Sequence, residues 1–126
     1  MPDQPVLSGL RVLVVEDDAL IAMLLEDLLD EFGCQVVGPA ATIGEALNLI
    51  EAATIDVALL DLNLGHGQTT YHLADVLGSQ GVPFAFVTGL DALSLQNPYE
   101  TSPTLQKPFR PADLERILTQ LATPRS

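Results

Sequence analysis

The chain has 126 residues, the length of one domain, and its 48% hydrophobic and 17% charged residues are typical of a globular protein. Seventeen acidic residues against five basic ones give a net charge of −12, which disfavours direct binding to nucleic acids and to anionic membranes. The single cysteine, Cys34, excludes an intrachain disulfide, and no apolar run approaches the ~20 residues of a membrane-spanning helix. We therefore expect one cytoplasmic domain over residues 1–126, with a core from about residue 10 to residue 122 and short flexible termini.

The chain alternates short apolar runs with longer stretches of helical periodicity. Residues 11–15 are almost wholly apolar, as in a parallel strand that is buried on both faces. After Asp18, apolar residues recur at three- and four-residue steps, which predicts a helix that Asp18 caps and Gly33 ends. The predicted strands, in chain order, cover residues 11–15, 34–38, 57–60, 83–87 and 104–106.

Further helices are predicted between and after these strands. Thr42 is placed to cap one of them, because Glu45 follows at the spacing of a capping box, and Pro111 suits the first turn of the last helix. The weak stretch is residues 90–103, whose only helical candidate, residues 90–96, is about two turns long. Strands alternating with helices predict an α/β fold, a doubly wound five-stranded parallel sheet with right-handed crossovers.

Polar residues stand where the predicted strands end. Acids follow the first and third strands, a threonine the fourth and a lysine the fifth; in this order they are Glu16 and Asp17, Asp61, Thr88 and Lys107. In the strand order 2-1-3-4-5 the first and third strands are neighbours, so the three acids would converge on one crevice, with the threonine and the lysine along its side. Converging carboxylates are relieved by a proton or by a cation, and oxygen ligands in an open cleft suit Mg²⁺ (or Mn²⁺). A carboxylate, a divalent cation and a cationic clamp are the parts that phosphoryl transfer onto Asp61 needs.

Other reactive residues have simpler explanations. Asp18 is better explained as a helix cap than as a metal ligand. Cys34 is best explained as a small buried hydrophobic residue. His66 lies in a glycine-rich loop, where it could modulate the site but is more simply a loop residue, and His72 is placed on a helix surface.

Four short motifs occur in a fixed order: Val14-Val15-Glu16-Asp17-Asp18, Leu60-Asp61-Leu62, Thr88-Gly89 and Lys107-Pro108-Phe109. From about Leu10 to Leu121 the sequence resembles the receiver domain of bacterial two-component response regulators. The resemblance implies a flavodoxin-like (βα)5 fold with phosphorylation on Asp61. It also implies a phosphodonor, either a sensor histidine kinase or a histidine phosphotransfer protein.

The resemblance further implies roles for individual residues. Asp17, Asp61 and the backbone carbonyl of Asn63 would hold Mg²⁺, with Glu16 acting through water. Thr88 and Lys107 would contact the phosphoryl group, with Gly89 beside them in the same switch region. Pro83-Phe84-Ala85-Phe86-Val87-Thr88-Gly89 is similar to the Phe-Ala-Thr-Gly stretch of certain stand-alone, single-domain receivers.

The sequence departs from the usual receiver pattern at three positions. Thr104 stands where Tyr or Phe is typical, Leu90 stands at an often aromatic position, and Gly65 stands where proline is common. Leu90 and Thr104, together with Asn63 two residues after Asp61, are candidate modulators of the site. We hypothesise that phosphorylation orders residues 90–103 as Thr88 moves toward the phosphoryl group, in place of the usual aromatic switch.

Alternatives from other classes remain. A haloacid-dehalogenase-type phosphatase also uses a strand-end aspartate as nucleophile. That class requires a second acidic residue two positions later, where this sequence has Asn63. A flavin or nucleotide binder would place a phosphate loop after the first strand, where three carboxylates stand instead. Within the receiver interpretation, which predicts a signalling domain and not an enzyme, two roles compete. The protein either binds a target when phosphorylated or acts as a phosphate sink or relay, and a homodimer is possible in either role.

Overall fold

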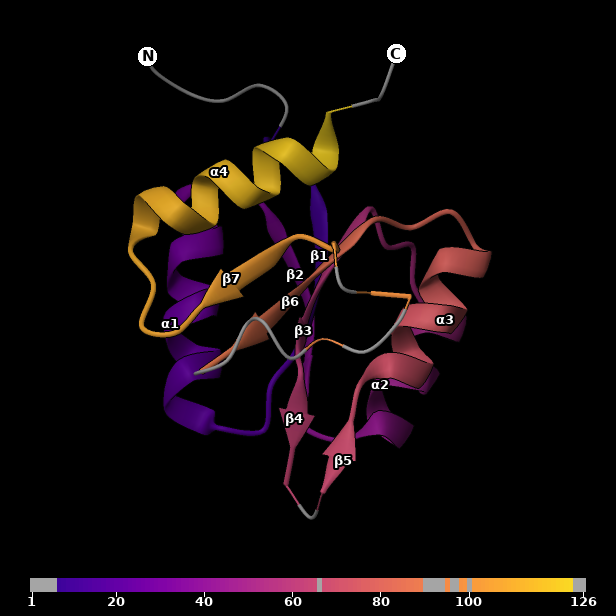
Figure 1. Cartoon of the computed structure of the whole chain (residues 1–126). Helices are drawn as coiled ribbons and strands as arrows, with labels where there is room; N and C mark the ends of the chain where they lie inside the picture. The colour runs from indigo at the N-terminus through magenta and orange to yellow at the C-terminus, as the bar shows by residue number, and fades with distance from the viewer. Residues whose placement is uncertain (1–6, 66, 90–94, 96–97, 100, 124–126) are drawn as a thin grey trace.

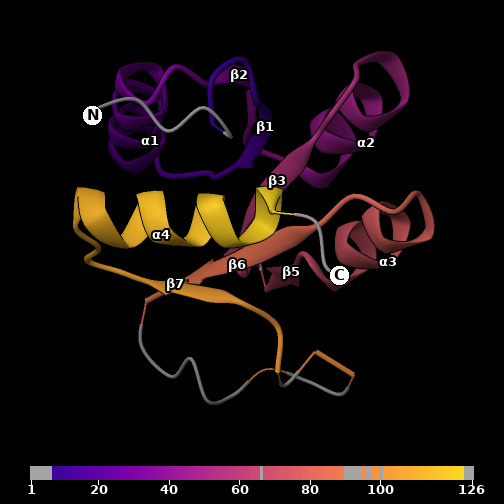
Figure 2. The same cartoon turned by 90° about the horizontal axis from the view of Figure 1, so that it is seen from above.

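A parallel sheet lies between two pairs of helices (Figures 1 and 2). The computed structural model describes residues 7–65, 67–89, 95, 98–99 and 101–123. The helices are α1 (Ala19–Glu31), α2 (Ile43–Ala52), α3 (Tyr71–Ser79) and α4 (Pro111–Ala122). The strands are β1 (Arg11–Val15), β2 (Gln35–Ala40), β3 (Val57–Asp61), β4 (Asn63–Leu64), β5 (Gln68–Thr69), β6 (Phe84–Thr88) and β7 (Thr104–Gln106). Within the described ranges, no helix combines the length and the apolar character needed to cross a membrane.

The main sheet has the order β2-β1-β3-β6-β7, and all neighbouring strands are parallel. This is the predicted order 2-1-3-4-5, because β6 and β7 are the fourth and fifth predicted strands. The predicted glycine-rich loop after β3 instead contains a small antiparallel hairpin, β4–β5, in which Gly67 adopts a positive φ of 74°. Apart from Leu95, the helical candidate at residues 90–96 lies outside the described residues.

The core has two layers, one on each face of the sheet, because successive strand residues point to opposite sides. Val12 and Val14 of β1 pack with α1 and α4, whereas Leu13 and Val15 pack with α2 and α3. All five residues of β3 are buried, as expected of a central parallel strand. The sheet therefore fixes the ends of β1, β3 and β6 side by side.

Two helix starts follow the predicted capping. Asp18 Oδ1 accepts hydrogen bonds from the backbone N–H groups of Leu20 (2.9 Å) and Ile21 (3.3 Å). Thr42 Oγ1 accepts from the N–H of Glu45 (3.1 Å), and the Glu45 carboxylate in turn accepts from the N–H of Ala41 (2.8 Å). Asp18 is thus occupied as a cap, as predicted.

The second strand runs two residues beyond its predicted end, to Ala40. The extension passes through Gly38, whose φ is +101°, and the pairing of β1 with β2 shifts register there. A Cβ at this glycine would lie 2.9 Å from the nitrogen of Ala40 and 3.1 Å from the carbonyl oxygen of Val14. Pro39 fits because β2 is an edge strand. The irregularity delivers the carbonyl of Ala40 to the N–H of Glu16 (2.9 Å) and so helps to hold the end of β1.

Replacing Gly38 with alanine should therefore lower the free energy of unfolding by roughly 1–3 kcal/mol, because the new Cβ is both crowded and in a disfavoured backbone conformation. Gly44→Ala is the matched control, since its Cβ would meet nothing within 4 Å and alanine favours a helix. Chemical denaturation of the two variants checks the prediction. Equal stability of the two variants would contradict it.

Candidate functional site

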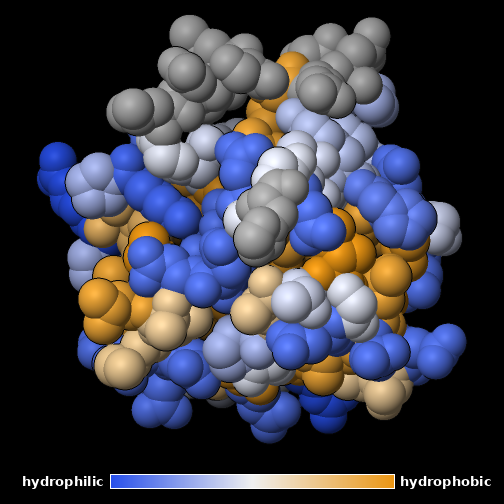
Figure 3. All heavy atoms as spheres, turned by 90° about the horizontal axis from the view of Figure 1, so that it is seen from below, coloured by the Kyte–Doolittle hydropathy of each residue, from blue (hydrophilic) through white to orange (hydrophobic). Residues whose placement is uncertain are grey.

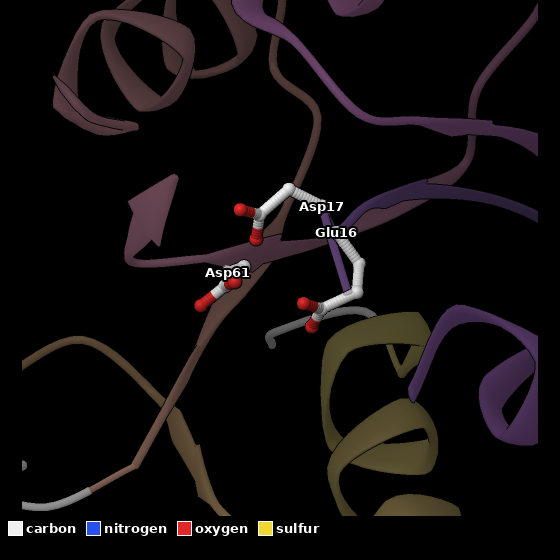
Figure 4. Close-up of side chains that lie close together, drawn as sticks. All are labelled: Glu16, Asp17 and Asp61. Atoms are coloured by element: carbon white, nitrogen blue, oxygen red, sulfur yellow. The ribbon is translucent and has the colours of Figure 1, made fainter. Parts of the chain in front are cut away.

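Three carboxylates meet where β1 and β3 end, and Figure 4 shows their side chains turned toward one another. The strands are in register at Val15 and Leu60, so the next residues, Glu16 and Asp61, lie side by side where the two strands end. One carboxylate oxygen from each of Glu16, Asp17 and Asp61 lies within 4.8 Å of the others. Glu16 and Asp61 are buried, whereas Asp17 is exposed. The structure thus brings together the three acids that the sequence placed in one crevice.

Lys107 reaches into this cluster from the end of β7. Its Nζ lies 3.1 Å from Oε1 of Glu16 and 3.5 Å from Oδ1 of Asp61. Its backbone N–H donates to the carbonyl of Thr88 (2.7 Å), which ties the ends of β6 and β7 together. Thr88 is buried, and it stands one residue beyond Val87, the partner of Asp61 across the β3–β6 pair. All five strand-end residues therefore lie along one edge of the sheet, with Gly89 half-buried beside them.

Backbone hydrogen bonds orient the two acids that follow β1. Oε2 of Glu16 accepts from the N–H of Asp18 (3.1 Å), and Oδ2 of Asp17 accepts from the N–H of Gly65 (3.1 Å). Gly65 stands where proline is common in receivers, and a proline would have no N–H to donate. This departure from the family pattern therefore supplies a contact to the site.

No sequence pattern indicates a role for Thr70, which the structure places next to the main chain of Asp61. Its Oγ1 donates to the backbone carbonyl of Asp61 (2.9 Å), and its N–H donates to the carbonyl of Leu62 (3.1 Å). Thr70 stands at the N-cap of α3, yet its side chain makes no capping bond. A threonine before a helix ordinarily indicates a cap, so this longer-range role has no sequence signal.

Burial changes the proton binding of the Asp61 carboxyl group. Removal from water raises the pKa of Asp61 from 3.8 to about 7; a hydrogen bond with Glu16 and the negative charge of Glu16 act in the same direction, and Lys107 opposes them. That hydrogen bond requires a proton on one of the two carboxyl groups. When both are ionised, the ammonium group of Lys107, 3.1 Å away, is the one partner of the buried Oε1 of Glu16 in the described structure.

These residues fit a divalent cation bound by oxygen. Ligands of an octahedral Mg²⁺ at about 2.1 Å are about 3–4 Å apart, and the three carboxylate oxygens lie within 4.8 Å of one another before any cation is bound. A cation there would relieve the repulsion among them and would neutralise the buried Glu16 oxygen. Asn63 is exposed in β4, two residues beyond Asp61, and its role as a ligand stays a prediction.

Position 104 is not aromatic, but an aromatic side chain lies close to it. Thr104 pairs with Phe86 across β6 and β7, and the ring of Tyr99 lies 5.7 Å from that of Phe86. Tyr99 also stacks on Tyr71 at 5.7 Å, and its hydroxyl donates to the carboxylate of Asp75 on α3. Leu90 and His66 lie outside the described residues, as does most of the 90–103 segment.

An apolar surface adjoins the carboxylates on the side of α1. Leu20, Met23 and Leu24 are its exposed members, with 77%, 55% and 46% of their surfaces accessible. Beside them a hollow of about 310 Å³ is lined by Ile21, Leu24, Gly89, Lys107, Pro108 and Phe109. Figure 3, which views this end of the molecule, shows hydrophobic atoms at the left, on the α1 side, and a second group at the right, with hydrophilic atoms between them.

Comparison with known proteins identifies the family. A sequence model described as "Response regulator receiver domain" matches residues 12–119. The chain belongs to this receiver family. The phyllosphere-induced regulator PhyR of Methylorubrum extorquens is 33% identical to this receiver over 114 residues, which are 87% of this chain and 42% of PhyR. The receiver therefore spans less than half the length of that curated relative.

Solved receivers show the same fold. The solution structure of SdrG from Sphingomonas melonis Fr1 is 35% identical with a TM-score of 0.80, and the match covers 95% of this chain and 100% of SdrG. A BeF3-activated conformation of SdrG from Pseudomonas melonis Fr1 is 38% identical with a TM-score of 0.80, covering 92% and 99% of the two chains. Membership of the Phe-Ala-Thr-Gly subfamily stays a prediction for this receiver.

The raised pKa of Asp61 makes a prediction for the metal-free protein. The folded state keeps the Asp61 proton up to about pH 7, whereas the unfolded chain releases it near 3.8, so this residue makes the protein less stable as pH rises between these values. Asp61→Asn should therefore raise the free energy of unfolding by roughly 1–3 kcal/mol at pH 8 and by much less at about pH 5. Denaturation in a chelator at both pH values checks this, and a gain that does not depend on pH would contradict it.

Proposed function

We propose that this receiver is the phosphoacceptor of a bacterial two-component system, in the cytoplasm, with Asp61 as the residue that is phosphorylated. A sensor histidine kinase or a histidine phosphotransfer protein would be the donor. The observation that carries the proposal is the convergence of Glu16, Asp17 and Asp61 with Lys107 at one edge of the sheet. A phosphatase of the haloacid-dehalogenase type is not favoured, because Asn63 offers no carboxylate as general acid.

The reaction is a displacement at phosphorus. An oxygen of Asp61 forms a bond to phosphorus while the bond from phosphorus to the donor's imidazole nitrogen breaks, and the departing nitrogen keeps the bonding electron pair and takes up a proton. The Nζ of Lys107 lies 3.5 Å from Oδ1 of Asp61, so it is placed to form an ion pair with the oxygens of a phosphoryl group on Asp61. The proposed role of Thr88 is to donate a hydrogen bond to one of them.

Mg²⁺ is the proposed cofactor, held by Asp17, Asp61 and the Asn63 backbone carbonyl, with Glu16 acting through water. When bound, it would neutralise charge on the phosphoryl oxygens and on the acids. Gly65 holds the Asp17 carboxylate in place, and Asp18 holds that of Glu16, so these two acids are oriented by the protein itself. This arrangement supports binding of a cation without large rearrangement of the side chains.

The exposed apolar surface of α1 supports a protein as the donor. Leu20, Met23 and Leu24 lie beside a hollow whose wall includes Lys107, so a protein seated there would be close to Asp61. These apolar side chains offer no hydrogen-bond donors or charges to a small phosphorylated molecule. The phosphorylated form would either bind a target or act as a phosphate sink for a kinase. A pull-down with and without beryllofluoride would distinguish these two roles.

Phosphotransfer from candidate kinases tests the proposal directly. With radiolabelled kinase and Mg²⁺, the wild-type protein should take up label, and Asp61→Asn should take up less than about 1% as much, because the amide cannot act as the nucleophile. Asp56→Asn, an exposed aspartate ahead of β3, is the matched control and should be labelled like the wild type. Labelling of Asp61→Asn at the wild-type level would refute the assignment.

Cation binding has its own test at two adjacent residues. Saturating Mg²⁺ should raise the Tm of the wild type, and Asp17→Asn should weaken the apparent affinity about tenfold or more, because one of the carboxylates is lost. Asp18→Asn removes the same charge from the next residue but keeps a capping side chain, so its affinity should change about twofold at most. Equal losses in the two variants would show that only general charge matters.

A further inference from the structure

The β4–β5 hairpin follows β3 directly, and Figure 1 shows it beyond the end of that strand. It begins with Asn63, whose carbonyl is one of the proposed cation ligands. The N–H of Gly65, in the turn of the hairpin, donates to Oδ2 of Asp17 (3.1 Å), a residue 48 positions away in the sequence. The hydroxyl of Thr70, directly after β5, donates to the carbonyl of Asp61 (2.9 Å). The hairpin thus contains or contacts each of the three residues proposed to hold Mg²⁺.

The base of the hairpin is fixed to the sheet and to the core. The N–H of Leu62 donates to the carbonyl of Val87 in β6 (2.8 Å), and the N–H of Thr70 donates to the carbonyl of Leu62 (3.1 Å). The side chains of Leu62 and Leu64 are buried in the core layer that faces α2 and α3. The N–H of Gly65, the residue after Leu64, is therefore a donor with a defined place next to the carboxylates.

Asp17 is the ligand that most needs such a donor. It is exposed, whereas Glu16 and Asp61 are buried. An exposed carboxylate samples several rotamers, and fixing one of them costs conformational entropy. The bond from Gly65 is the one hydrogen bond to the Asp17 side chain in the described part of the chain, and it lowers this cost before a cation binds. A carboxylate has about four lone-pair sites, so acceptor capacity remains for the cation.

Thr70 holds the other side of the site through the main chain. Its side chain is fully buried and makes no capping bond to α3, although the residue stands at the N-cap. The hydroxyl is used instead on the carbonyl of Asp61. That carbonyl belongs to the peptide unit that leads from Asp61 toward Asn63. A bond to it limits rotation between these two proposed ligands.

We propose that the β4–β5 hairpin is a positioning element for the cation, with Gly65 and Thr70 as its positioning residues. Strand order brings the acids together, and the hairpin orients the side chain of Asp17 and the main chain of Asp61. Loss of groups that hydrogen-bond to metal ligands typically weakens metal binding 10–100-fold. The proposal rests on the cation site of the proposed function and deepens it, but its test needs neither a kinase nor phosphorylation.

Removal of the Gly65 N–H tests the contact with Asp17. Gly65→Pro deletes the donor, and Leu64 before it is already extended, as the residue before a proline prefers. Titration with MgCl2, followed by NMR shifts of backbone amides, should show an affinity about tenfold weaker than that of the wild type. Gly65→Ala keeps the N–H, and its Cβ would make only an ordinary contact with Oδ2 of Asp17 (3.5 Å), so it should retain the affinity within about twofold.

A second substitution shows whether Gly65 acts through Asp17. In an Asp17→Ala background, Gly65→Pro should change the Mg²⁺ affinity by about twofold at most, because the carboxylate that the N–H positions is absent. An effect of the proline on the fold alone would instead be the same with and without Asp17. Equal losses in the two backgrounds would therefore overturn the proposal.

Thr70 and Thr69 form a matched pair at the other end of the hairpin. Thr70→Val keeps the shape of the side chain but removes the donor to Asp61, so the Mg²⁺ affinity should fall about tenfold, and Thr70→Ser, which keeps the hydroxyl, should restore most of it. The hydroxyl of Thr69 makes no hydrogen bond in the described structure. Thr69→Val should therefore change the affinity by about twofold at most.

Wild-type affinity in Gly65→Pro or in Thr70→Val would overturn the proposal, as would an equal loss in Thr69→Val. The two contacts lie at different ends of the hairpin, so each variant tests the proposal even where thermal melts show that the other is unfolded. Absence of Mg²⁺ binding by the wild type would overturn the proposed cation site together with this proposal. Normal binding by the wild type and by both variants would contradict the role of the hairpin alone and leave the phosphoacceptor proposal standing.

Discussion

Two carboxyl groups, those of Glu16 and Asp61, are buried together at the end of the sheet, and Lys107 is the one cation that contacts them in the described part of the chain. Burial of like charges is costly unless a proton or a cation relieves it. In this protein the buried carboxyl groups lie together where the neighbouring strands β1 and β3 end. The raised pKa of Asp61, the ion pair of the buried Glu16 oxygen with Lys107 and the fit to a divalent cation are consequences of the same constraint.

The rest of the fold holds these charges in place. The ladder between β1 and β3 sets the separation of Glu16 from Asp61, and the β6–β7 pair delivers Lys107 from a strand that lies two places away from β3. Helices cover both faces of the sheet, so the carboxylates open only toward the edge where the strands end. The geometry of the site is therefore a property of strand order more than of any single loop.

Much of this could be predicted, because burial and capping leave local patterns. The apolar runs of β1 and β3 and the caps Asp18 and Thr42 follow from such patterns, whereas the predicted strand order depended on the doubly wound fold and on the family resemblance. Features that depend on distant contacts could not be read in the same way. The path of β2 past Gly38 and Pro39 resembles a strand end, and the bond from Thr70 to the Asp61 carbonyl exists only because the β4–β5 hairpin returns the chain.

The hydrogen bond from Thr70 to the Asp61 carbonyl also affects how a receiver of this kind could transmit a signal. The main chain at Asp61 is held from two directions, by the threonine hydroxyl on its carbonyl and by the following N–H, that of Leu62, on the carbonyl of Val87 (2.8 Å). A group attached to the Asp61 side chain is thereby anchored to the rigid centre of the sheet. Under the proposed phosphorylation of Asp61, conformational change would therefore come from the neighbouring loops, while the main chain at Asp61 stays in place.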